Sequence, residues 1–221
     1  MTDGAAAAQA FYGRWAGLYD RIATLTPGVG GAREAAVNAL ALDPGDTVVE
    51  MGCGTGANLP LLRQQVGPAG RVVGVDFTRG MLDRATARAD RWENVHLVQG
   101  DAVRPPVDGP VDAVLATFVV GMLPNPGATV ESWLDLLGLD GRLALLDAAR
   151  SNRWYARPLN AGFRGFVRAS APGGGAGYEE SPTAVLDRRV TDARDALKRH
   201  AIDVEEDSHL LGFVYLALGK R

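Results

Sequence analysis

The sequence has few of the residues that build disulfides and metal sites. Of its 221 residues one is cysteine, Cys53, and three are histidines, His96, His200 and His209. A single cysteine cannot close an intramolecular disulfide, and the histidines lack the spacing of metal ligands. These shortages predict a protein of the reducing cytoplasm that holds no metal.

Long apolar runs are missing as well. The longest, "VDAVLATFVVGML" and "LGFVYLALG", fall short of the roughly 20 residues that a membrane-spanning helix needs. The N-terminal "MTDGAAAAQA" has no basic start, so it makes a poor signal peptide. We therefore expect no transmembrane segment.

An excess of positive charge is also absent. The chain has 23 basic and 26 acidic residues and a net charge of -3. Proteins that hold nucleic acid usually present a strongly basic surface to the phosphates. The charge balance therefore argues against a nucleic acid partner.

What the chain does contain is an alternation of strand and helix patterns. Strands are expected at 47–51, 71–76, 94–99, 111–118 and 142–147, and helices at 32–42, 57–66, 79–91 and 128–137. The strands are mostly apolar rather than alternating, as expected when helices cover both faces of a parallel sheet. The pattern predicts a doubly wound, Rossmann-like α/β domain.

A glycine-rich loop follows the first of these strands, in "VVEMGCGTGANLP". Gly52, Gly54 and Gly56 could simply turn the chain from strand to helix, but two further acids favour a nucleoside site. Asp76 closes the second strand, where a carboxylate can accept both ribose hydroxyls, and Asp101 follows the third, where it can meet an adenine amino group.

The acid before the loop narrows the choice of ligand. Read with Ala57, the loop fits the pyrophosphate fingerprint of dinucleotide-binding proteins. Glu50 would repel a pyrophosphate, whereas it would suit the ammonium group of S-adenosylmethionine, which carries no phosphate. A NAD-dependent dehydrogenase and a noncatalytic nucleoside-binding protein remain alternatives of a different class.

The segments "VVEMGCGTG", "VVGVDFTRGMLDRA", "VHLVQGDA" and "GRLALLDAAR" resemble the successive motifs of class I S-adenosylmethionine-dependent methyltransferases over residues 46–148. The opening "FYGRWAGLYDRI" resembles the ubiquinone/menaquinone biosynthesis C-methyltransferase family and its phospholipid N-methyltransferase relatives. The resemblance implies seven strands in the order 3-2-1-4-5-7-6, with the seventh antiparallel. It also implies a cofactor site formed by Tyr19, Glu50, Gly52, Cys53, Gly54, Gly56, Asp76, Phe77, Met81, Asp101, Ala102 and Thr117.

The domain organisation follows from this assignment. We expect a single domain over residues 1–221, with N-terminal helices in 1–45 and the cofactor-binding core in 46–148. Residues 149–182 lack a strand pattern and are rich in aromatics, which indicates an insertion that covers the active site as a lid. Residues 183–221 are expected to form a charged helix and a final antiparallel hairpin.

Several residues are candidates for chemistry or acceptor binding. Asp147 and Arg150 follow the fifth strand and could orient or deprotonate a substrate, although a solvated salt bridge explains them equally well. Cys53 is more simply a loop-packing residue than a nucleophile. The expected acceptor-binding residues are Tyr12, Phe118, Trp154, Tyr155, Phe163 and Phe166.

The function expected from these features is methyl transfer to a small apolar acceptor. The first choice of acceptor is a quinol or other prenylated aromatic methylated on carbon. Phosphatidylethanolamine or another small molecule methylated on nitrogen or oxygen is the alternative. Arg157, Arg164 and Arg168 would share one helical face, which suits peripheral contact with an anionic membrane.

Overall fold

A computed structural model describes residues 27–170 and 180–221. Residues 1–26 of the expected N-terminal helices and residues 171–179 of the expected lid lie outside the described residues. Within the described ranges, no helix is long and apolar enough to cross a bilayer.

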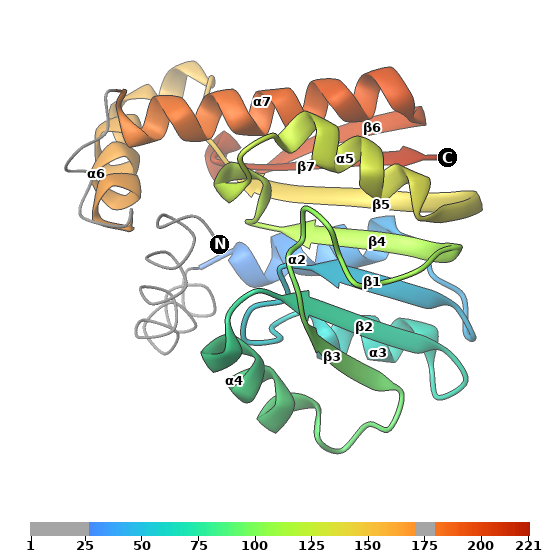
Figure 1. The fold of residues 1–221 in the computed structure, drawn as a ribbon. Coiled ribbons are helices and arrows are strands. Elements are labelled where there is room, and N and C mark those ends of the chain that lie inside the picture. The colour runs from blue at the N-terminus through green and yellow to red at the C-terminus, as the bar shows by residue number, and fades with distance from the viewer. Residues whose placement is uncertain (1–26, 171–179) are drawn as a thin grey trace.

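One seven-stranded sheet forms the centre of the protein, in the order β3-β2-β1-β4-β5-β7-β6. Strand β7 pairs antiparallel with both β5 and β6, and the remaining pairs are parallel. The predicted strand order and the antiparallel seventh strand are confirmed (Figure 1). The strands are β1 (Thr47–Met51), β2 (Arg71–Asp76), β3 (Val95–Gln99), β4 (Val111–Thr117), β5 (Leu137–Ala148), β6 (Ile202–His209) and β7 (Val214–Lys220).

Helices cover both faces of this sheet. One core cluster joins α5 and α7 to the sheet, and a second joins α2, α3 and α4 to its other face. The helices are α2 (Val29–Ala39), α3 (Leu59–Val66), α4 (Arg79–Ala89), α5 (Pro126–Asp135), α6 (Asn160–Ser170) and α7 (Pro182–His200). Short 3-10 turns are η1 (Val120–Met122), η2 (Trp154–Leu159) and η4 (Leu210–Gly212).

The fifth strand is longer than its sequence pattern predicted. It starts at Leu137, a residue assigned to the preceding helix from the sequence, and its pairing with β4 shifts register between Val111 and Ala113. The turn-like "GLDG" at 138–141 is the reason, because Asp140 adopts a positive φ within the strand. The irregularity concealed the true start of β5.

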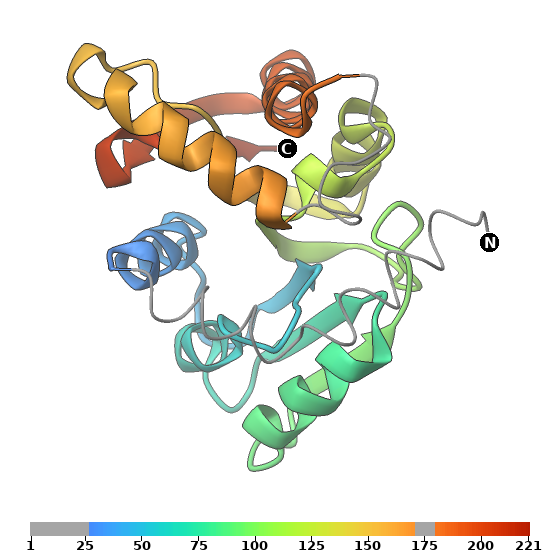
Figure 2. The same cartoon turned by 90° about the vertical axis from the view of Figure 1, so that its left-hand side faces the viewer.

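The insertion after β5 is helical. Pro158 lies inside η2, and α6 begins two residues later at Asn160. Figures 1 and 2 place α6 beyond the carboxyl ends of the parallel strands, on the side of β5. The segment is therefore positioned where a cover for the site was expected.

One edge of the sheet is strongly acidic. The edge strand β6 carries Asp203, Glu205, Glu206 and Asp207, all of them exposed. Arg194 and Lys198 of α7 both pair with Glu206, at 2.8 and 2.9 Å. These ion pairs attach α7 to the edge strand.

Candidate functional site

The three acids predicted at the strand ends are brought to one edge of the sheet. Glu50 lies on β1 opposite Gly74 of β2, and Asp76 ends β2 opposite Gln99 of β3. Asp101 follows β3 and is exposed. Since these strands are parallel neighbours, the acids line the carboxyl edge, where open α/β sheets bind ligands.

The glycine loop between β1 and α3 is held by Asp76. The two oxygens of the Asp76 carboxylate accept hydrogen bonds from the backbone amides of Gly54 and Thr78, each at 2.8 Å. Burial raises the pKa of Asp76, and the backbone hydrogen bonds partly oppose that rise. The carboxylate thus joins the loops that follow β1 and β2.

Gly56 is the position in this loop where a side chain would do most damage. Its φ is +80°, and an added Cβ would lie 2.6 Å from Cδ1 of Leu59 and 3.3 Å from Cα of Ala85. We expect Gly56→Ala to lower the free energy of unfolding by about 1–3 kcal/mol, because it combines backbone strain with a clash.

Urea denaturation measures this effect, and Gly31→Ala is the matched control. Gly31 lies in α2, and an added Cβ there would have nothing within 4 Å. Since alanine is the better helix former, this control should gain up to about 1 kcal/mol. Equal stability of the Gly56 variant and the wild type would contradict the strain assigned to the loop.

A buried polar network lies beneath the loop. Nδ2 of Asn58 donates to Oε1 of Glu50 at 2.6 Å and to Oγ1 of Thr117 at 3.0 Å. The guanidinium of Arg33 donates to Oδ1 of Asn58 at 3.1 Å and to the same Thr117 oxygen at 3.2 Å. The network connects α2, β1, β4 and the start of α3, so it fixes the elements around the loop.

Glu50 contributes a carboxyl oxygen with unsatisfied bonding capacity to this network. Only 1% of its surface is exposed, and within the described structure its Oε2 has no hydrogen-bond partner. Burial raises the pKa of Glu50 to about 7, against the lowering effects of the Asn58 hydrogen bond and the Arg33 charge. An orphaned carboxyl oxygen fits a ligand with a positive group, such as the ammonium of S-adenosylmethionine.

The residues expected around adenine lie on the next two loops. Phe77 is half-buried, and Met81 is buried in the first turn of α4. The carbonyl of Ala102 accepts a hydrogen bond from the indole of Trp133, at 2.8 Å. Trp133 is fully buried in α5 and thereby fixes the loop that carries Asp101.

The carboxyl end of β4 carries the predicted Thr117 and Phe118. Thr117 is buried and belongs to the polar network, whereas Phe118 is half-buried and adopts a positive φ of 58°. The Arg33 guanidinium lies 5.1 Å from the centroid of the Phe118 ring, within cation–π range. Strained non-glycine residues cluster at functional sites, which favours Phe118 as part of the acceptor pocket.

Cys53 behaves as a packing residue. It is buried, and its backbone amide donates to the carbonyl of Val75 at 3.0 Å. Burial raises the pKa of its thiol well above the ordinary value, so the reactive thiolate is suppressed. The interpretation of Cys53 as loop packing agrees with this environment.

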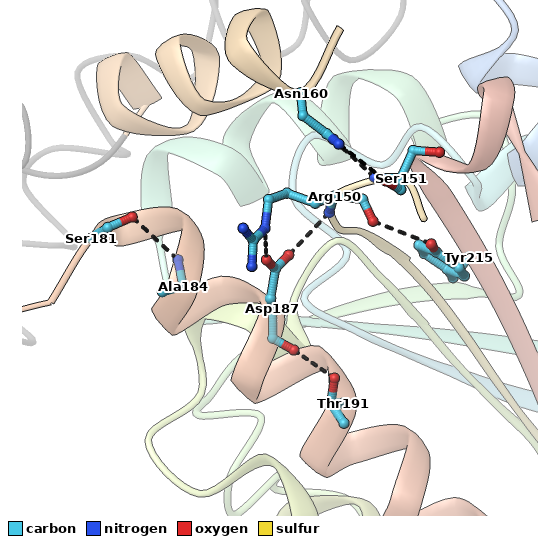
Figure 3. Close-up of polar contacts among 8 residues, drawn as sticks. All are labelled: Arg150, Ser151, Asn160, Ser181, Ala184, Asp187, Thr191 and Tyr215. Atoms are coloured by element: carbon cyan, nitrogen blue, oxygen red, sulfur yellow. Dashed lines mark hydrogen bonds and ion pairs between the residues drawn. The ribbon is translucent and has the colours of Figure 1, made fainter. Parts of the chain in front are cut away.

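The sequence placed Asp147 and Arg150 in the crevice, and here the structure differs. Asp147 is buried among Val120, Leu145 and Val190 beneath α7, where it accepts backbone hydrogen bonds from η1. Side chains alternate along a strand, and residue 147 falls on the α7 face. Arg150 pairs instead with Asp187 of α7, as the salt-bridge alternative expected (Figure 3).

The aromatic residues of the insertion do not form one cluster. The Phe163 ring packs on Phe213, with centroids 5.3 Å apart, while Phe166 is 50% exposed. Trp154 and Tyr155 meet edge to face at 5.8 Å and are 79% and 45% exposed. The remaining predicted residues, Tyr12 and Tyr19, lie outside the described residues.

Two residues of the network were missed in the sequence. Asn58 directly follows the glycine loop. A polar residue at the start of a helix beside that loop could have indicated its role in the network. Arg33 interrupts the alanine-rich buried stripe of α2. A charged residue on a buried stripe could have indicated a buried polar partner. Within the described residues, no group of three or more histidine, cysteine or acidic side chains is placed to hold a metal ion.

Comparisons with known proteins point to one class. Residues 48–141 match the family model described as a methyltransferase domain. Arsenite methyltransferase of Halobacterium salinarum is 35% identical over 50% of this chain and 29% of its own length. The 2-phytyl-1,4-naphtoquinone methyltransferase of Thermosynechococcus vestitus is 40% identical over 44% of each chain. The chain thus spans less than half the length of either relative.

Solved structures agree on the fold. A SAM dependent methyltransferase from Aquifex aeolicus superposes with a TM-score of 0.62 over 85% of this chain and 88% of its own, at 19% identity. The matched region contains the glycine loop and its acids and therefore resembles a methyltransferase domain. The seven-stranded fold of the described residues is that of solved SAM dependent methyltransferases.

Proposed function

We propose that this chain transfers a methyl group from S-adenosylmethionine to a small apolar acceptor, with a quinol or prenylated aromatic methylated on carbon as the best candidate. The observation that carries the proposal is the carboxyl edge itself. There the glycine loop, Asp76 and the unsatisfied oxygen of Glu50 lie together. When bound, S-adenosylmethionine supplies an activated methyl group, and the protein contributes alignment worth about 7–11 kcal/mol.

The residues have separable roles in this proposal. Asp76 and the loop amides orient the ribose, and Glu50 faces the ammonium end. Thr117 ends β4 and Phe118 follows it, and β4 lies between β1 and β5 in the strand order. The acceptor would then lie between β4 and α6, where the apolar side chains of α6 exclude water.

Two observations support an apolar aromatic acceptor. Leu159 of η2 and Phe166 of α6 are 52% and 50% exposed, so this segment offers apolar surface to an acceptor. A relative named for a naphthoquinone substrate matches this chain. Phosphatidylethanolamine or another small acceptor methylated on nitrogen or oxygen is the alternative.

Arsenite is a less suitable acceptor for this chain, although one relative carries its name. Arsenite is a soft, thiol-seeking species, and soft ligands are supplied by cysteine. The chain has one cysteine, Cys53, which is buried within the glycine loop. A pocket open to arsenite would therefore lack thiolate ligands from this chain.

The lid provides a direct test of the acceptor. We expect Phe163→Ala combined with Phe166→Ala to keep S-adenosylmethionine affinity within about threefold, which is under 1 kcal/mol. Methyl transfer to a demethylated quinol should fall by about tenfold or more, because the acceptor loses its apolar cover. Calorimetric titration and S-adenosylhomocysteine release measure the two effects.

Leu139→Ala is the matched control for this double variant, since Leu139 is 96% exposed at the amino end of β5. Its activity should equal that of the wild type. A large drop in melting temperature with loss of cofactor binding in the double variant would place both rings in the permanent core instead. Tight NAD binding by the wild type without S-adenosylmethionine binding would favour the dehydrogenase alternative.

A further inference from the structure

A second concave site lies on the α7 side of the sheet. Its walls are the loop that follows β5, the η2–α6 junction, α7 and Tyr215 of β7, and they enclose about 620 Å³. This volume is in the range of small-molecule pockets. Every lining residue falls at or after position 149, so none belongs to the glycine loop or to β1–β4. The cavity therefore shares no lining residue with the proposed cofactor site.

The charge of its walls is positive. Arg150, Arg157 and Arg194 line the cavity, against one acid, Asp187. The Asp187 carboxylate is already paired with Nε of Arg150, which leaves the terminal nitrogens of that guanidinium for a ligand. Among the described residues, Arg157 forms no ion pair. Arginine forks match carboxylate and phosphate groups in geometry, so the walls suit an anion.

The walls are also held in place before any ligand binds (Figure 3). The amide of Ser151 donates to Oδ1 of Asn160 at 3.1 Å, and Nδ2 of Asn160 donates to the carbonyl of Ser151 at 3.0 Å. The hydroxyl of Tyr215 donates to the Arg150 carbonyl at 3.2 Å. A rigid wall loses little conformational entropy on binding, which favours affinity.

An unsatisfied polar group lies next to this cavity. Asp147 is 4% exposed, and within the described structure its Oδ2 has no hydrogen-bond partner. It lines a small adjoining cavity of about 10 Å³ that shares Val190, Arg194 and Tyr215 with the larger one. Burial raises the pKa of Asp147 well above its ordinary value, which favours the neutral form of this carboxyl.

We propose that this cavity binds a small organic anion. Its carboxylate or phosphate group would meet Arg150 and Arg157, and its apolar body would lie against Val190 and the ring of Tyr215. The guanidinium of Arg194 lies 4.9 Å from the centroid of that ring and is held there by Glu206, so it extends the positive wall. The inference does not depend on which acceptor is methylated.

Binding of 4-fluorobenzoate to the full chain, followed by fluorine NMR, tests the proposal. We expect saturable binding, competition by inorganic phosphate if phosphate groups are also accepted, and no binding of the neutral 4-fluorobenzamide. Arg157→Gln should weaken 4-fluorobenzoate binding by about tenfold or more, the effect of losing one charge-assisted hydrogen bond. Arg164→Gln removes a neighbouring exposed arginine that does not line the cavity, and it should change affinity by less than about twofold.

The binding experiments have outcomes that support the proposal and outcomes that contradict it. If 4-fluorobenzoate binds and phosphate does not compete with it, the ligand is a carboxylate. If phosphate alone binds saturably, the ligand is a phosphate. In both cases Arg157→Gln should weaken the binding of that probe. If neither probe binds saturably, the proposal is wrong. It is also wrong if Arg157→Gln and Arg164→Gln weaken binding equally, because the positive charge of the surface would then explain the effect.

Discussion

Glu50→Gln is expected to raise the free energy of unfolding of the ligand-free chain by about 3 kcal/mol at pH 8. The reason is that burial raises the pKa of Glu50 from 4.5 to about 7. Each unit of such a shift corresponds to about 1.4 kcal/mol between the two protonation states. Glutamine is neutral at every pH and can still accept the Asn58 hydrogen bond.

The sign of the pH dependence follows from the direction of the shift. The folded chain retains the Glu50 proton up to about pH 7, whereas the unfolded chain loses it near 4.5. The stabilisation from the raised pKa is therefore complete below about pH 4.5, declines as the pH rises to about 7, and is absent above. The advantage of Glu50→Gln over the wild type should grow across that window.

Urea denaturation at pH 4.5, 6 and 8 measures this difference, and Glu34→Gln, an exposed carboxyl on α2, is the control. A stability difference that stays constant with pH would refute the raised pKa.

The same substitution should weaken S-adenosylmethionine binding, because it removes the charge that faces the ammonium group, and it should create no NAD affinity. Stability and cofactor binding should thus change in opposite directions.

Asp76→Ala is expected to lower affinity for S-adenosylhomocysteine by at least about tenfold, since each hydrogen bond to a charged group contributes about 1.5–3 kcal/mol. Two effects combine here. The ribose loses its acceptor, and the amides of Gly54 and Thr78 lose the carboxylate that joins their loops. Calorimetric titration measures the change, and circular dichroism checks that the fold survives.

Two further variants separate these effects. Asp76→Asn retains one carbonyl oxygen for one of the two amides, so its affinity should fall between those of the wild type and the alanine variant. Asp83→Ala removes an exposed acid on α4 that pairs with Arg79 alone, and it should bind normally. Undiminished binding by Asp76→Ala would show that the ribose does not lie at this carboxylate.

The sequence was sufficient for features that depend on local pattern. The parallel strands have near-continuous apolar runs, and the strand order followed from the family resemblance. Glu50, Asp76 and Asp101 could be placed at one edge because the carboxyl ends of parallel strands coincide. The polar network was not predicted because Arg33 meets Asn58 and Thr117 across 25 and 84 residues of chain, and no periodicity reports such contacts.

The local sequence pattern also did not predict the orientation of single side chains. Asp147 follows four buried residues at the end of β5, and nothing local states which helix covers its side of the sheet. In the insertion, which was expected to bind the acceptor, Phe163 packs on Phe213 while Trp154 is largely exposed, and the sequence pattern specified neither environment. Tertiary contacts decide both outcomes.

The acidic edge strand restricts how two copies of this chain can associate. A sheet that continued from one molecule into the next through β6 would bring Asp203, Glu205, Glu206 and Asp207 close to the same four residues of the second copy. Like charges on directly opposed strand positions repel one another, and charged edges are a common protection against such pairing. Arg194 and Lys198 offset part of this charge at Glu206, and Lys220 offsets part of it at Asp203. Association through this edge is therefore unfavourable at neutral pH, and it becomes less so in acid or at high salt.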